Sequence, residues 1–114
     1  MIRAAVVVTC APLLAVSPLA LSQSWPSKPV RLVVPFSSGG TTDIVARLYA
    51  QRLTEALGTQ FVVDNRAGAG GTIGTEAGAR SAPDGYTFVF GSTSSTAVSP
   101  GLYPKLSFDI LRDF

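Results

Sequence analysis

Histidine is absent from this sequence of 114 residues, and cysteine occurs once, as Cys10. Histidine is the commonest general base in enzymes and the commonest metal ligand, so its absence removes the usual route to acid–base catalysis and to a metal centre. A single thiol forms neither an intramolecular disulfide nor a cysteine-rich zinc cluster. These two scarcities argue against a metalloprotein and against a disulfide-stapled secreted domain.

Charge is also scarce. Only 14% of the residues are charged, the formal net charge is +2, and no block of basic residues occurs. A nucleic-acid partner or an anionic membrane surface is therefore not predicted, because both recruit clustered Lys and Arg. The apolar fraction of 46% is ordinary for a globular protein, and the length suits one small domain.

The N-terminus has the pattern of a secretory signal. A short start carrying Arg3 precedes residues 4–21, which hold no charge, and small residues follow. Such a charged, then apolar, then small pattern predicts a cleavable signal peptide at residues 1–22 and export to the periplasm. The competing interpretation, a transmembrane anchor, is borderline in length and is interrupted by Pro12 and Pro18.

The remaining chain, residues 23–114, alternates between strand and helix patterns. Nearly continuous apolar or β-branched runs predict buried strands at residues 30–36, 60–64 and 86–90. Apolar residues spaced three and four apart predict a helix that Thr41 or Thr42 caps and Gly58 ends. A second helix, capped by Thr72 and running to about residue 82, is built of small residues that would allow close approach to a sheet.

This β-α-β-α-β order predicts an α/β fold with a parallel sheet and right-handed crossovers. The carboxyl ends of such strands are where open sheets bind ligands. Three loops rich in Gly, Ser and Thr fall there, and two of them lead into helices whose first N–H groups attract anions. The candidate ligand-binding residues are Phe36, Ser37, Ser38, Gly39, Gly40, Thr41, Thr42, Asp43, Gly70, Gly71, Thr72, Ser92, Ser94, Ser95 and Thr96.

Two charged residues in these loops allow two interpretations each. Arg66 either contacts a ligand or pairs with Asp64. Asp43 either stabilises the start of the helix or receives a ligand amine.

Catalytic motifs are missing from the sequence. The glycine segment at residues 68–74 departs from the dinucleotide-binding fingerprint in spacing and follows the second strand, not the first. Neither a phosphate-binding P-loop nor a serine-nucleophile elbow occurs, and the aspartates lack metal-loop spacing. We therefore predict a non-enzymatic protein with no catalytic residue, no metal and no cofactor. A nucleotide-using α/β enzyme and a fragment that binds nothing are the alternatives.

Several segments resemble the Bug family of periplasmic solute-binding proteins, the receptors of tripartite tricarboxylate transporters. The matching segments are residues 25–36, 39–43, 62–74, 82–87 and 102–106, with Asp109 and residues 112–114. Ser37 and Ser38 stand where the family often has prolines.

The resemblance implies the type II periplasmic-binding-protein fold, in which two α/β domains close on a ligand. Residues 23–114 would then be the N-terminal part of the first domain, with the second domain absent. The implied function is capture of a small carboxylate: a dicarboxylate, a tricarboxylate, an acidic amino acid or an aromatic acid. The implied partners are the permease subunits of such a transporter, unless the protein serves in sensing, and the full-length form would be a monomer.

Overall fold

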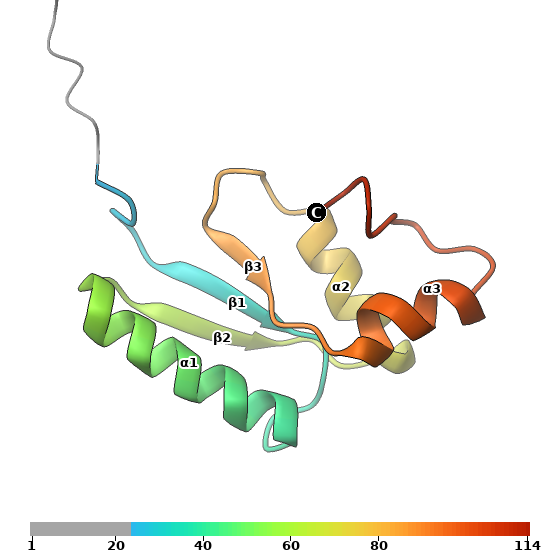
Figure 1. Ribbon diagram of the computed structural model, residues 1–114, viewed down its shortest axis with the longest axis horizontal. Coiled ribbons are helices and arrows are strands. Elements are labelled where there is room, and N and C mark those ends of the chain that lie inside the picture. The colour runs from blue at the N-terminus through green and yellow to red at the C-terminus, as the bar shows by residue number, and fades with distance from the viewer. Residues whose placement is uncertain (1–23) are drawn as a thin grey trace, which may run out of the picture.

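A computed structural model describes residues 24–114, so the predicted signal peptide lies outside the described residues. The elements follow one another as β1 (Val30–Val34), α1 (Thr41–Leu57), β2 (Phe61–Asn65), the short turn η1 (Ala69–Gly71), α2 (Thr72–Ala79), β3 (Thr87–Val89), the turn η2 (Ser94–Val98) and α3 (Ser99–Leu102). This order confirms the predicted α/β fold class (Figure 1).

The three strands form one parallel sheet in the order β2-β1-β3. Val30 aligns with Phe61 on one side of β1, and Leu32 aligns with Phe88 on the other. Because β1 is central, its apolar run is buried on both faces: Val30, Val33 and Val34 are fully covered. The three predicted strands are confirmed, with shorter bounds in two of them. β1 ends at Val34, two residues before the predicted end, and β3 spans only the middle three residues of the predicted range 86–90.

The two main helices cover opposite faces of the sheet, as right-handed crossovers in opposite directions require (Figure 1). On the α1 face, Ala50 packs with Val30, Leu32 and Phe61 in the core cluster. On the other face, the predicted close approach of α2 is confirmed. A Cβ added at Gly74 would lie 2.6 Å from the Cα of Pro35, so only glycine fits there.

Both predicted threonine caps are wrong. Thr41 and Thr72 are the first helical residues, and the cap positions belong to Gly40 and Gly71 without any side-chain cap. The Asp43 carboxylate instead reaches back to the loop before α1 and accepts a hydrogen bond from the Gly39 N–H at 2.8 Å, while the first N–H groups of the helix stay uncapped. The predicted C-terminal stop is confirmed, because Gly58 adopts the left-handed conformation that ends α1.

The predicted polar loop after the third strand is partly helical. η2 and α3 form two consecutive turns where a loop and an irregular connection were expected, and α2 ends at Ala79, about three residues early. The Ser92 carbonyl nucleates η2, since it accepts hydrogen bonds from the N–H groups of Ser95 and Thr96. Local side-chain and backbone bonds of this kind leave no apolar periodicity, which is why the pattern did not reveal the helix.

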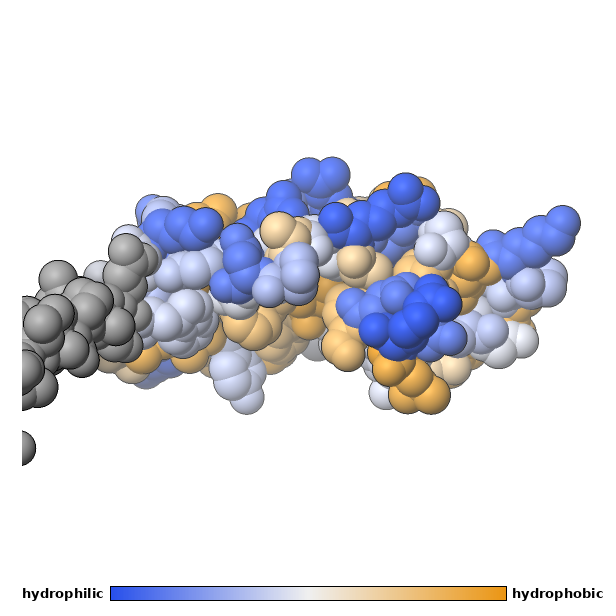
Figure 2. Space-filling model, turned by 90° about the horizontal axis from the view of Figure 1, so that it is seen from above, coloured by the Kyte–Doolittle hydropathy of each residue, from blue (hydrophilic) through white to orange (hydrophobic). Residues whose placement is uncertain are grey.

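Apolar side chains remain at the surface. Ile44 and Leu48 on α1, Phe88 on β3 and Leu102 on α3 are each more than 40% exposed. Figure 2 shows hydrophobic residues between hydrophilic ones on the face that it presents. Beside α1, an apolar groove of about 400 Å³ runs over β1 and β3. Among the described residues, every helix is too short or too polar to cross a membrane.

Candidate functional site

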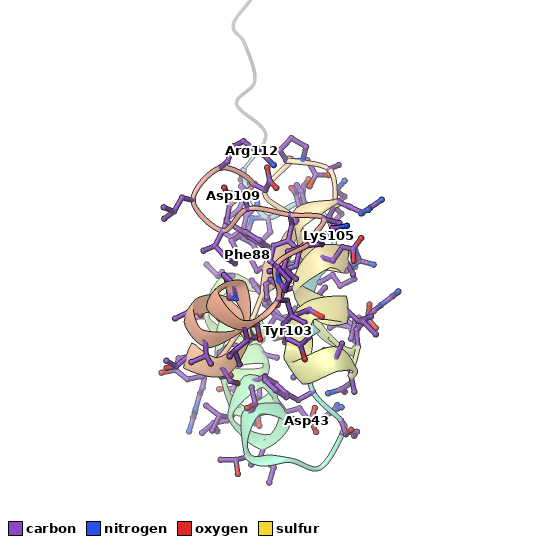
Figure 3. All side chains as sticks on the ribbon, turned by 90° about the vertical axis from the view of Figure 1, so that its right-hand side faces the viewer. Asp43, Phe88, Tyr103, Lys105, Asp109 and Arg112 are labelled. Atoms are coloured by element: carbon purple, nitrogen blue, oxygen red, sulfur yellow. The ribbon has the colours of Figure 1, made fainter. Side chains whose placement is uncertain are left out.

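The three predicted loops converge at the carboxyl edge of the sheet. Gly71 marks the meeting point: a Cβ added there would lie 2.7 Å from the Cβ of Ser95 in the third loop and 3.3 Å from the ring of Phe36 in the first. Figure 3 looks onto this edge, with Asp43 at the start of α1 and Tyr103 between α2 and α3. The predicted meeting of the three loops at one edge of the sheet is therefore confirmed.

The start of α1 offers unused N–H groups. Within residues 24–114, the backbone N–H groups of Thr41, Thr42 and Asp43 donate no hydrogen bond. Ile44 is the first residue of the helix to donate, to the Gly40 carbonyl at 3.0 Å. The start of α1 therefore combines three unpaired N–H groups with the positive end of the helix dipole, an arrangement that suits an anion.

Asp43 does not take part as a free carboxylate, because a closed ring of hydrogen bonds holds it. Arg47 donates from Nε to Asp43 Oδ2 at 3.0 Å and from Nη2 to Asn65 Oδ1 at 3.0 Å. Asn65 donates from Nδ2 to Asp43 Oδ1 at 2.9 Å, which closes the ring. Asp43 is only 2% exposed. The structure thus supports the helix-start interpretation over the ligand-amine interpretation.

The ring also ties the first loop to the end of β2. Asn65 Nδ2 donates to the Phe36 carbonyl at 3.1 Å, and Gly39 donates to Asp43 Oδ2. Hydrogen bonds from Arg47, then Gly39, then Asn65 hold the pKa of Asp43 well below its usual range, against the opposing effect of burial. Asp43 is therefore ionised at neutral pH, and its charge is compensated by Arg47.

Several predicted hydroxyls are used inside the protein. Thr72 Oγ1 donates to the Ala69 carbonyl at 2.9 Å, and Thr96 Oγ1 donates to the Ser92 carbonyl at 2.9 Å. Ser95 is fully buried, and its Oγ accepts the Ser92 N–H at 3.0 Å. These residues shape the loops from within, whereas Ser37, Ser38, Thr41 and Ser94 are exposed at the surface.

The second loop contributes through its backbone. Gly70 is exposed, has φ +65° and adjoins the hydroxyls of Ser99 and Tyr103, each 3.6 Å from the position of an added Cβ. Arg66 pairs with Asp64 at 3.1 Å, which is the second of the two interpretations left open for it. The described residues contain no group of three or more His, Cys, Asp or Glu side chains that could hold a metal ion.

Sequence reasoning left Arg47, Asn65 and Tyr103 out of the candidate ligand-binding residues, although it placed Asn65 at the start of the second loop of this edge. Asn65 had a detectable signal, because a polar residue that directly ends a buried parallel strand lies at the ligand-binding edge. Arg47 also had a signal, because it lies four residues after Asp43 on the predicted helix, the spacing of an ion pair on one helix face. Tyr103 had none, since it follows Asp43 by 60 residues.

Comparison with known proteins shows the family of this chain. Residues 45–114 match the Tripartite tricarboxylate transporter family receptor, TctC. The chain belongs to the TctC family. Protein BugT of Bordetella pertussis is 46% identical over 93 residues, which cover 81% of this chain and 28% of BugT.

Solved TctC-like structures share the fold. MatC from Rhodopseudomonas palustris with bound malate has a TM-score of 0.74 at 39% identity, over 79% of this chain and 31% of MatC. A second R. palustris protein, with adipate, has a TM-score of 0.63 at 41% identity, over 76% of this chain and 29% of that protein. The chain thus has the periplasmic-binding-protein fold of a solute-binding family, and it spans less than a third of the length of these relatives.

Proposed function

We propose that the protein carrying this chain is a periplasmic receptor that captures a small carboxylate at the rim of residues 36–43, 70–72 and 92–96 without reacting with it. The observation that carries the proposal is the set of unpaired N–H groups of Thr41, Thr42 and Asp43 at the start of α1, the helix that follows the first of the three loops. A carboxylate accepts such donors and is stabilised by the helix dipole.

The relatives support this chemistry. Malate and adipate, the ligands named for two family structures, are both dicarboxylates. The local charge supports it as well, because the buried Asp43 is neutralised by Arg47 and does not leave a bare anion at the rim. Capture without reaction fits a rim that, in the described residues, combines glycines and hydroxyls with backbone donors and has no histidine.

We further propose that the receptor is exported by residues 1–22, acts as a monomer and delivers its ligand to the permease subunits of a tripartite tricarboxylate transporter. Family membership supports this partner class. A receptor used in sensing would bind the same ligands, so the binding test below applies to both.

The test is a calorimetric titration of the complete gene product against malate, adipate, citrate, glutamate and nicotinate. Each acid is paired with its amide or ester as a matched neutral control. We expect one acid to bind and its neutral counterpart to bind far more weakly, because the dipole and N–H donors select the charged group. Failure of every carboxylate, or a melting-temperature shift with NAD or ATP instead, would contradict the proposal and favour the enzyme alternative.

A further inference from the structure

The first turn of α1 holds an internal anion in the same place where the proposed ligand anion binds. Asp43 is the third residue of the helix and is almost fully buried, so its carboxylate occupies part of the positive potential at the helix start. Two like charges that share one helix end repel each other, and burial weakens the screening by water. Without compensation, Asp43 would oppose the binding of any carboxylate at this rim.

Arg47 supplies the compensation from one helical turn away. Its Nε lies 3.0 Å from Asp43 Oδ2, and its side chain is 52% exposed while that of Asp43 is 3% exposed. The guanidinium thus approaches from the solvent side of the helix, and Asn65 fixes its other end through Oδ1. The Asp43–Arg47 pair is close to neutral as a unit, which leaves the dipole of α1 free for the ligand.

We propose that Arg47 is a positioning residue that tunes ligand affinity by cancelling the charge of Asp43, in addition to holding the ring together. This inference rests on the proposed carboxylate-binding function. It implies that Arg47 acts without touching the ligand, and that its effect on affinity depends on Asp43 being charged.

A double-mutant cycle on the complete gene product, made of the wild type, Arg47→Gln, Asp43→Asn and the double variant, tests the inference, with affinity measured for the carboxylate that binds the wild type. Arg47→Gln leaves Asp43 uncompensated, and we expect affinity to fall about tenfold, which corresponds to ~1.4 kcal/mol. Arg47→Lys keeps the positive charge but loses the two-point contact, so it should lower stability while keeping most of the affinity. Asp43→Asn combined with Arg47→Gln removes both charges and should recover most of the affinity lost in the single variant.

Arg52→Gln is the matched control, because Arg52 lies on the same helix and pairs with Glu55, at 73% and 52% side-chain exposure. It should leave affinity unchanged. Near-wild-type binding by Arg47→Gln would overturn the inference, and so would a double variant that binds no better than Arg47→Gln, since either result means that the charge of Asp43 does not act on the ligand. A wild type that binds none of the carboxylates would instead refute the proposed function itself. Melting curves of each variant separate loss of fold from loss of affinity.

Discussion

Close packing of α2 against backbone atoms just after β1 and β2 leaves room only for glycine at residue 74, and Gly74→Ala tests it directly. The added Cβ would lie 2.6 Å from the Arg66 carbonyl oxygen and 2.6 Å from the Pro35 Cα, both backbone atoms that cannot rotate away. Overpacking a core contact costs about 1–3 kcal/mol, and rigid backbone neighbours place this position at the upper end. Alanine regains about 1 kcal/mol of helix propensity over glycine, so we expect a net loss of about 2 kcal/mol.

Urea unfolding of the complete gene product, followed by circular dichroism, measures this loss. Gly101→Ala is the matched control, because it also lies in a helix and an added Cβ there meets nothing within 4 Å. The control should be neutral or stabilised by up to about 1 kcal/mol. Carboxylate affinity should fall with Gly74→Ala as well, since α2 and the Gly71 loop must move away from Pro35. Equal stabilities for the two alanine variants would refute the close-packing argument.

Three other predictions concern single contacts. Gly71→Ala should destabilise the fold by about 2 kcal/mol or more in urea unfolding, because residue 71 has φ +95° and its added Cβ would press on Ser95. Wild-type stability of this variant would contradict the prediction. Asp43→Asn should lower the melting temperature most at neutral pH, because the lowered pKa of Asp43 makes its stabilising effect complete above the ordinary pKa and lost as the pH falls through the folded value. Thermal melts of wild type and variant should therefore converge on acidification below about pH 4, and a constant difference in melting temperature would refute the assignment. Trp25→Phe should lower the free energy of unfolding by about 0.5–1 kcal/mol, because it removes the Nε1 hydrogen bond to the Gly85 carbonyl at 3.1 Å while an aromatic ring still packs on Tyr86. An unchanged urea midpoint would show that this hydrogen bond contributes nothing to stability.

Much of the architecture follows from local patterns. The apolar runs near residues 30 and 61 predict buried strands, and Gly58 predicts the end of α1 to the residue. Parallel strands joined by short helical crossovers bring their carboxyl ends to one edge, so the meeting of the three loops follows from element order alone. The small residues of α2 likewise predict its close approach to the sheet, which Gly74 confirms.

The partners of the polar side chains do not follow from local patterns. Asp43 and Asn65 are 22 residues apart, and nothing in their local sequence indicates that Asn65 closes a ring with Asp43 and Arg47. The threonine caps failed for the same reason. Thr41 is a good capping residue by type, but the folded loop makes it the first residue of the helix and leaves the cap position to Gly40.

The sequence by itself therefore determined the order, direction and approximate bounds of the elements, because hydrophobic periodicity and glycine stops act over a few residues. The tertiary structure alone decided which residue of β2 completes the ring around Asp43 and which loop hydroxyls are used inside the protein. Those outcomes depend on hydrogen-bond geometry between segments, such as Arg47 reaching both Asp43 and Asn65 at 3.0 Å, and residue types do not encode such distances.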